Sequence, residues 1–207
     1  RGIEELKKAG IEFQINTTIT RHNVDQAQAM LDLAVRLGAA AHHIFLLVPT
    51  GRAKDMTDQE ISAAQYEEIL HWFYEMRSAV PIHLKATCAP HFYRVLRQEA
   101  HRKGEKVDYA TYGLDAMTRG CLGGTSFCFI SHVGTVQPCG YLEVQSGDLR
   151  TSTFKEDWEN SPVFTKLRDF SNYKGKCGVC EYLKFCGGCR ARAFEATGDF
   201  MEEEPLC

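Results

Sequence analysis

GKCGVCEYLKFCGGCRARAFEATGDFMEEEPLC, residues 175–207, holds five of the nine cysteines of this 207-residue chain. Within it, Cys177 and Cys180 form one Cys-x2-Cys pair, Cys186 and Cys189 form a second, and Cys207 ends the stretch. Such tight loops bring soft thiolate ligands within reach of one metal site. The odd number of cysteines and this spacing argue against a disulfide scaffold. The stretch therefore predicts a fold stabilised by metal–thiolate bonds, and we expect a cytoplasmic protein.

Three upstream cysteines extend the pattern. Cys121 is followed by 12 residues, Gly134, four residues and Cys139, and Cys128 lies inside this interval. With the tail this makes eight cysteines, enough for two four-thiolate sites, and only Cys88 is left over. One zinc ion could bind the two Cys-x2-Cys pairs, but zinc ribbons usually separate such pairs by about 15–20 residues. Spacing therefore favours iron–sulfur clusters, with a zinc-stapled binding or electron-transfer module as the alternative.

The composition is that of an ordinary globular protein. Hydrophobic residues make up 44% and charged residues 25% of the chain, and the net charge is −3. Nucleic-acid-binding domains usually show a basic stripe, so we expect no nucleic-acid partner. We also expect no membrane span, because no apolar run approaches the length of about 20 residues that a bilayer requires. The opening RGIEELKKAGIEF resembles a helix running into a strand, so we expect the chain to be the C-terminal part of a longer protein.

Helix and strand patterns alternate along residues 1–84. Apolar spacing and β-branched composition predict these elements: a helix over 1–9, a strand over 11–20, a helix over 23–39, an almost wholly apolar strand over 42–49 that is covered on both faces, a helix over 57–80 and a strand over 81–86. Asn23 is the expected N-cap and Gly38 the expected end of the second helix. Thr57 and Glu60 form the expected capping box of the third helix. This rhythm indicates right-handed βαβ units in an open sheet or barrel.

The composition shifts to Gly, Cys and Phe from residue 121 onward. FCFISHVGTVQPC predicts a β-hairpin with its turn near Gly134, and TFKEDWENSPVFTKLRDF predicts one or two short helices. We place a domain boundary near residue 115, which divides the chain into residues 1–114 and 115–207.

The cysteine pattern resembles a known family. Cys-x12-Gly-x4-Cys, then Cys-x2-Cys-x5-Cys, then a nearby and a distant last cysteine, is similar to the SPASM domain, the auxiliary-cluster module of many radical S-adenosylmethionine enzymes. The resemblance covers residues 121–207, and residues 1–84 resemble the closing strands and helices of that family's partial barrel. The implied fold class is α/β: the C-terminal part of a partial (β/α) TIM barrel, followed by a small α+β cysteine-rich SPASM domain. One departure is the two-residue gap between Cys186 and Cys189, where the family usually has three residues.

The resemblance implies two auxiliary 4Fe-4S clusters. The first would be bound by Cys121, Cys128, Cys139 and Cys189, and the second by Cys177, Cys180, Cys186 and Cys207. The chain would then cross between the sites, which makes cluster binding part of folding. The family's signature for a third 4Fe-4S cluster, Cys-x3-Cys-x2-Cys, is not in this sequence. We therefore expect this chain to be inactive alone, and the full-length enzyme to bind S-adenosylmethionine and the third cluster.

Three sequence segments around these motifs resemble the tetrapyrrole-modifying branch of the family. They are GCLGGTSFCFISHVGTVQPCGYLEVQSGDLR (120–150), FLLVPTGRAKDM (45–56) and CGGCRARAFEATGDFMEEEPLC (186–207). The resemblance implies oxidative decarboxylation of iron-coproporphyrin III propionates to heme b, through a 5′-deoxyadenosyl radical, with an auxiliary cluster accepting the surplus electron. It also implies an electron donor such as ferredoxin or flavodoxin. Alternatives are deacetylation of 12,18-didecarboxysiroheme, heme d1 maturation and peptide modification.

Polar residues at the ends of two predicted strands are candidate cofactor ligands. Asn16, Thr18 and Thr20 end the first strand, where family members approach the adenosyl ligand and where barrels place their active sites. The alternative is that they hydrogen-bond only to neighbouring residues. After the next strand, Gly51 permits close backbone approach, and Arg52 can grip a propionate or the carboxylate of S-adenosylmethionine with two hydrogen bonds. A plain surface arginine is the alternative for Arg52.

Four further residues and one acidic run carry weaker hypotheses. Cys88 and His91 are candidates to face the porphyrin or its iron, against the alternative of buried structural residues. Arg190 and Arg192 are candidates to hydrogen-bond cluster sulfurs or substrate carboxylates, against the alternative of solvated helix charges. The acidic run at 202–204 is expected to be a solvated face.

Overall fold

A parallel three-stranded sheet organises the first half of the chain. The structure is a computed structural model that describes residues 1–207. The strands β1 (Gln14–Ile19), β2 (Ala41–Leu46) and β3 (His83–Thr87) pair in the order β1-β2-β3. Thr18 lies opposite Phe45, and Phe45 lies opposite Thr87. The carboxyl ends of the three strands therefore meet at one edge of the sheet, as the alternating pattern predicts.

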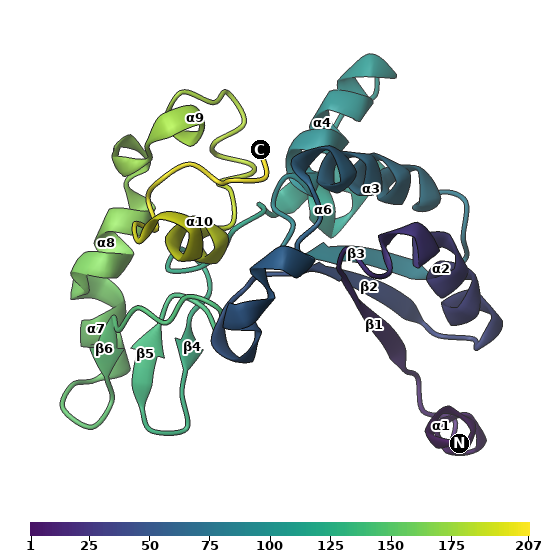
Figure 1. Ribbon diagram of the computed structural model, residues 1–207, viewed down its shortest axis with the longest axis horizontal. Coiled ribbons are helices and arrows are strands. Elements are labelled where there is room, and N and C mark those ends of the chain that lie inside the picture. Colours follow the sequence, from purple (N-terminus) through teal and green to yellow (C-terminus); the bar gives the residue numbers. More distant parts are fainter.

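Helices cover one face of this sheet (Figure 1). They are α2 (Ala27–Arg36), α3 (Ala63–Met76) and α4 (Phe92–Arg102). Along β2, His42, Ile44 and Leu46 are buried, whereas His43 and Phe45 are only half-buried. The prediction that this strand is covered on both faces is therefore wrong, because only alternate side chains join the core under the helices. That core contains 19 buried residues.

The structure corrects two predicted caps. Residues Gly51–Gln59 form a 3₁₀ segment, η2, and Glu60 is extended, so Thr57 and Glu60 do not start α3. The capping box is Ser62 with Gln65: the Gln65 backbone N–H donates to Ser62 Oγ at 3.2 Å, and the Ser62 N–H donates to Gln65 Oε1 at 3.1 Å. Asn23 Oδ1 accepts from the Thr20 N–H at 2.9 Å, which closes the strand-end turn instead of capping a helix.

A second sheet, small and antiparallel, lies in the cysteine-rich half. The strands β4 (Phe129–Ile130), β5 (Thr135–Gln137) and β6 (Gly147–Asp148) pair in that order. The predicted hairpin is confirmed, with Gly134 at its turn in the left-handed conformation, φ 87°. The remaining elements are α1 (Gly2–Lys8), η1 (Val24–Gln26), α5 (Tyr109–Tyr112), α6 (Leu114–Met117), α7 (Phe154–Asn160), α8 (Pro162–Arg168), η3 (Phe170–Asn172), α9 (Gly175–Gly178) and α10 (Arg190–Thr197).

The cysteine-rich half has little apolar core of its own. Its two hydrophobic clusters hold four buried residues each, one of them Val48 from the parallel half, against 19 in the core of the parallel half. The last residues of the chain return from α10 toward the helices of the parallel half (Figure 1). A boundary near residue 115 stays a prediction. None of the helices has the length and apolar character that spanning a membrane would need.

Candidate iron–sulfur sites and the adjoining cavity

Four tail cysteines line one cavity. These are Cys177, Cys180, Cys186 and Cys207, named here the tail thiol group. Short turns place them: Cys177 lies in α9, and Cys180 follows that helix by two residues. Backbone N–H groups face two of the sulfurs, because the Tyr182 N–H donates to Cys180 Sγ and the Gly188 N–H donates to Cys186 Sγ, each at 3.4 Å. The structure thus brings together the four residues predicted for the second cluster.

Two glycines separate Cys186 from Cys189, and the two cysteines lie in different surroundings. Gly187 and Gly188 both adopt left-handed backbone conformations, with φ 73° and φ 58°. A Cβ on Gly188 would lie 3.3 Å from Cys177 Sγ and 2.9 Å from Glu204 Cβ. The two-residue gap therefore depends on glycine, because only glycine adopts these backbone angles easily. The chain turns sharply after Cys186, and Cys189 lies outside the cavity of the tail thiol group.

A second set of thiols lies on the other side of this turn. Cys139 and Cys189 pack together against Val48 and Leu142. The Cys121 N–H donates to the Cys186 carbonyl at 3.1 Å, which ties the start of this region to the tail. Burial, with the nearby thiols of Cys121 and Cys189, raises the pKa of Cys139 to about 12. Cys121, Cys139 and Cys189 are named here the hairpin thiol group.

Cys128 and Cys88 differ in their relation to the hairpin thiol group. Cys128 precedes β4, and burial raises the pKa of its thiol without a contribution from another thiol. Cys88 packs against the hydrophobic cluster that contains Cys139 and Cys189. Its pKa is raised by burial and then by the thiols of Cys189, Cys139 and Cys121. The ninth cysteine, left unassigned by sequence spacing, therefore adjoins this group.

Arg190 is buried beside the tail thiol group and hydrogen-bonds the backbone that follows α10. Its side chain is 2% exposed and donates to the carbonyls of Phe200 at 3.0 Å and Glu202 at 2.7 Å. Its Nη2 also approaches Cys177 Sγ at 3.5 Å. The alternative of a solvated charge is therefore wrong for Arg190, and its hydrogen bond to a cluster sulfur or a substrate carboxylate stays a prediction.

Arg192 joins the two halves of the chain. It is 1% exposed and donates to Glu204 Oε1 at 2.5 Å and to the carbonyls of Leu47 at 3.0 Å and Cys88 at 3.2 Å. Glu204 is also buried, and its Oε2 lies 3.3 Å from His91 Nε2. The prediction of a solvated acidic face is therefore wrong for Glu204, because a buried guanidinium and a buried imidazole partner its carboxylate. No periodic pattern in the sequence marks this network.

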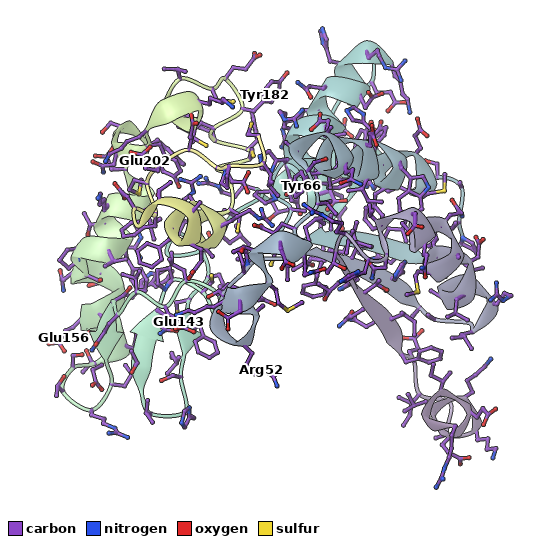
Figure 2. The ribbon with its side chains drawn as sticks, viewed as in Figure 1. Arg52, Tyr66, Glu143, Glu156, Tyr182 and Glu202 are labelled. Carbon is purple, nitrogen blue, oxygen red and sulfur yellow. The ribbon has the colours of Figure 1, made fainter.

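His91 is a structural residue of this network. Its Nδ1 lies 3.1 Å from the Tyr66 hydroxyl, and burial lowers its pKa to about 4. The Tyr66 ring lies at the junction of the two halves (Figure 2). His91 borders the tail thiol group and is not among the residues that line the cavity described next.

An open cavity lies at the carboxyl ends of β1 and β2. Its volume is about 340 Å³, and it is lined by Thr18, Phe45, Leu46, Leu47, Val48, Thr50, Arg52, Ala53, Cys88 and Tyr141. It is named here the strand-end cavity. Two predicted cofactor residues, Thr18 and Arg52, share it, and Figure 2 shows Arg52 on the η2 segment near Glu143. Thr50 Oγ1 is buried without a hydrogen-bond partner, so it remains available to a ligand.

The structure does not bring the other predicted strand residues into this cavity. Asn16 lies lower on β1, opposite His43, and its Oδ1 accepts from Gln14 Nε2 at 2.9 Å. Thr20 lies beyond β1, where its N–H donates to Asn23 Oδ1. Tyr141, which the sequence did not single out, contributes from the loop after Cys139. Its position follows from the loop after Cys139 packing beside the end of β2, where Leu142 joins Val48 in one hydrophobic cluster.

The donor set of the tail thiol group fits an iron–sulfur cluster. All nine cysteines are free thiols. Four cysteines facing one cavity, with backbone N–H and guanidinium donors at their sulfurs, match the thiolate ligation and sulfur hydrogen bonding that such clusters use. Gly188 leaves space beside the Cys177 sulfur that a side chain at this position would fill. These residues therefore fit the cofactor that the sequence resemblance implies.

Comparisons with known proteins agree with this geometry. Residues 121–190 match SPASM, an iron–sulfur cluster-binding domain. The chain is 59% identical over 207 residues to the AdoMet-dependent heme synthase of Nitratidesulfovibrio vulgaris and 56% identical over 206 residues to that of Methanosarcina barkeri. All of this chain is covered, against 56% and 58% of the two relatives. The chain thus spans a little over half the length of these relatives.

A solved structure supports the fold. Streptococcus suis SuiB bound to S-adenosylmethionine superposes with a TM-score of 0.68 at 16% identity, covering 100% of this chain and 48% of that chain. This likeness agrees with the observed order of a parallel sheet followed by a cysteine-rich α+β region, and the predicted fold class is confirmed. Over residues 121–190 the chain therefore matches the SPASM iron–sulfur cluster-binding domain, and over its whole length it is similar to AdoMet-dependent heme synthases.

Proposed function

We propose that this chain is the C-terminal portion of a heme-synthesising enzyme that oxidatively decarboxylates the propionates of iron-coproporphyrin III. The observation that carries the proposal is the 59% identity, across all 207 residues, to an AdoMet-dependent heme synthase. The matched region includes both thiol groups and the strand-end cavity. Identity at this level over every element that builds a site favours a shared substrate class over the peptide-modifying and deacetylating alternatives.

The thiol groups are the proposed ligands of two auxiliary 4Fe-4S clusters. Cys177, Cys180, Cys186 and Cys207 would bind one. Cys121, Cys139 and Cys189 would bind the other, with Cys128 predicted from the sequence as its fourth ligand. Such clusters supply one-electron transfer when bound. The protein's part is to hold the thiolates near one another, with the N–H groups of Tyr182 and Gly188 donating to two of the sulfurs.

The strand-end cavity is the proposed place where substrate and S-adenosylmethionine meet this chain. Arg52 would pair with a carboxylate, because a guanidinium offers two parallel donors to it. Thr18 and the unpartnered Thr50 hydroxyl would hydrogen-bond polar groups of either molecule. Asn16, the third cofactor residue predicted from the sequence, is exposed on β1 outside this cavity and would contact only a ligand that extends along the strand. The full-length protein would add S-adenosylmethionine contacts and a third 4Fe-4S cluster, and a ferredoxin or flavodoxin is the proposed electron donor.

The proposal is tested with the full-length protein, purified without oxygen. We expect incubation with iron-coproporphyrin III, S-adenosylmethionine and a reductant to release carbon dioxide and give heme b, as read by mass spectrometry. Release of acetate from 12,18-didecarboxysiroheme, or no turnover of either compound, would contradict the substrate assignment. An upstream coding sequence without Cys-x3-Cys-x2-Cys would contradict the radical mechanism. A colourless protein with one or two zinc ions would indicate the zinc-stapled module.

A pair of variants tests whether Arg52 binds a substrate carboxylate in the strand-end cavity. We expect Arg52→Met to raise the KM for iron-coproporphyrin III about tenfold or more, because a charged hydrogen-bond pair contributes roughly 1.5–3 kcal/mol. Arg36→Met is the matched control, since Arg36 is an exposed arginine at the end of α2. Equal kinetics for the two variants would place the propionates elsewhere.

A further inference from the structure

Cys88 has an unusual backbone conformation. It directly follows β3 and is the one non-glycine residue of the chain with positive φ, 55°. Side chains with a Cβ rarely adopt this conformation, and where they do, the surrounding structure enforces it, often at a functional site. The position is thus one where glycine would be the easier residue, and the chain has a thiol there.

A buried arginine enforces this conformation. Arg192 Nη2 donates to the Cys88 carbonyl at 3.2 Å and to the Leu47 carbonyl at 3.0 Å. Arg192 lies three residues after Cys189, at the start of α10. One guanidinium therefore fixes the peptide of Cys88 relative to the loop that presents Cys189, although the two cysteines are about a hundred residues apart in sequence.

The Cys88 side chain faces the hairpin thiol group. It packs against the cluster formed by Val48, Leu142, Cys189 and Ala191, beside Cys139. It also lines the strand-end cavity together with Tyr141. Cys88 thus occupies the wall between the cavity and the hairpin thiols. Cys128, by contrast, precedes the short edge strand β4, whose residues are exposed.

We propose that Cys88 is the fourth thiolate ligand of the iron–sulfur site formed by Cys121, Cys139 and Cys189, and that Cys128 is not a ligand. This assignment rests on the proposed function only in requiring a cluster at that site. With Cys88 the site has four thiolates, and the fourth comes from the parallel half of the chain. The assignment also means that one ligand thiol lies at the wall of the strand-end cavity, which is the space proposed for the substrate.

Paired variants of the full-length protein test the assignment. Cys88→Gly removes the thiol while suiting the positive φ, and Cys128→Gly is the matched control. After anaerobic reconstitution without any tetrapyrrole, we expect Cys88→Gly to lose about four iron atoms per chain, the content of one cluster. We expect Cys128→Gly to keep them. The opposite pattern, or full iron in both variants, would overturn the proposal.

The tail thiol group gives an internal control for folding. Its cluster should keep its electron paramagnetic resonance signal in Cys88→Gly if the variant is folded. If that signal is lost as well, thiol alkylation of the unsubstituted protein decides. We expect Cys88 to be alkylated only after iron is removed by a chelator, and Cys128 to be alkylated in both states. Alkylation of Cys88 in the iron-loaded protein would overturn the proposal.

The same experiment separates this assignment from the proposed function. Protein that binds no iron at all would contradict the proposed function. Protein that binds iron but leaves Cys88 free would contradict only the ligand assignment. Protection of Cys88 that appears only when an iron porphyrin is added would indicate a ligand to the substrate iron, and it would likewise overturn the assignment to the cluster.

Discussion

The two thiol groups are built in opposite ways. The tail thiol group, Cys177, Cys180, Cys186 and Cys207, comes from the last 31 residues of the chain and is shaped by α9 and short turns. The hairpin thiol group, Cys121, Cys139 and Cys189, comes from three distant segments, and its arrangement depends on Arg192 reaching the ends of β2 and β3. The first group is therefore specified locally, and the second needs the whole fold.

This difference predicts which parts depend on iron. The parallel half has a core of 19 buried residues, whereas the clusters near the thiol groups have four each. Metal binding supplies folding free energy where apolar burial is small. The cysteine-rich half should thus be metal-dependent, and the parallel half should not.

The largest expected effect is that of iron removal. We expect chelation to remove protection from amide hydrogen exchange across residues 121–207, because the thiolates lose the bonds that hold their loops. Helices α3 and α4 should keep their protection, since they lie in the large core. Hydrogen-exchange mass spectrometry of the full-length protein checks this. Unchanged protection in residues 121–207 would show that the cysteine-rich half folds without metal.

The second effect is that of breaking the buried Arg192–Glu204 ion pair, which lies where the cysteine-rich half meets the parallel half. Arg192→Met should lower the free energy of unfolding by about 3–5 kcal/mol, because it leaves a buried carboxylate without its partner. That carboxylate is Glu204, whose side chain is fully buried. Chemical denaturation measures the change, and Arg150→Met, at an exposed position, is the control. The hairpin thiol group should lose iron before the tail thiol group; the reverse order would contradict the comparison above.

Two glycines with similar backbone angles give a third, smaller effect. Gly188 has φ 58° and is crowded by Arg190 and Glu204, whereas Gly198 has φ 77° and nothing within 4 Å of its Cβ position. Gly198→Ala should cost about 1 kcal/mol through backbone strain alone. Gly188→Ala should cost about 2 kcal/mol more, since overpacking adds to the strain, and it should reduce iron content. Thermal unfolding and iron analysis of the pair check this; equal losses would mean that the turn between Cys186 and Cys189 is not tightly packed.

The smallest effect is a pH dependence in the parallel half. Burial and the neighbouring His43 lower the pKa of His42, whose Nε2 lies 3.0 Å from Thr17 Oγ1. As the pH falls below about 6.5, the unfolded chain takes up a proton that folded His42 resists, so stability decreases. We expect His42→Gln to flatten this part of the stability profile, measured by denaturation between pH 7 and the lowered pKa. His22→Gln, at an exposed position, should leave the profile unchanged. Identical profiles for the two variants would show that His42 does not cause this pH dependence.

Local patterns in the sequence were enough to predict much of the fold. The three parallel strands and the hairpin at Gly134 follow from periodicity and turn residues, whereas the composition of the tail thiol group came from the family resemblance. The start of α3 did not follow, because Thr57-x2-Glu60 and Ser62-x2-Gln65 offer competing caps and tertiary packing selects the second.

Contacts between distant segments were beyond the reach of sequence patterns. Glu204 resembles its exposed neighbours in sequence, and only the fold places Arg192 and His91 beside it. Cys88 has no spacing relation to the other cysteines, and Tyr141 reaches the strand-end cavity only because the loop after Cys139 packs beside the end of β2. Such residues lack a local signature because long-range packing creates their environment.

The most direct test of the central claim is an iron count on paired variants. The claim is that the two thiol groups hold separate four-iron clusters. In the full-length protein we expect about twelve iron atoms per chain, including the third cluster, and about eight in either Cys177→Ser/Cys180→Ser or Cys121→Ser/Cys139→Ser. Each variant should keep the Mössbauer signal of the other group. Loss of both signals from one variant, or zinc in place of iron, would contradict the claim.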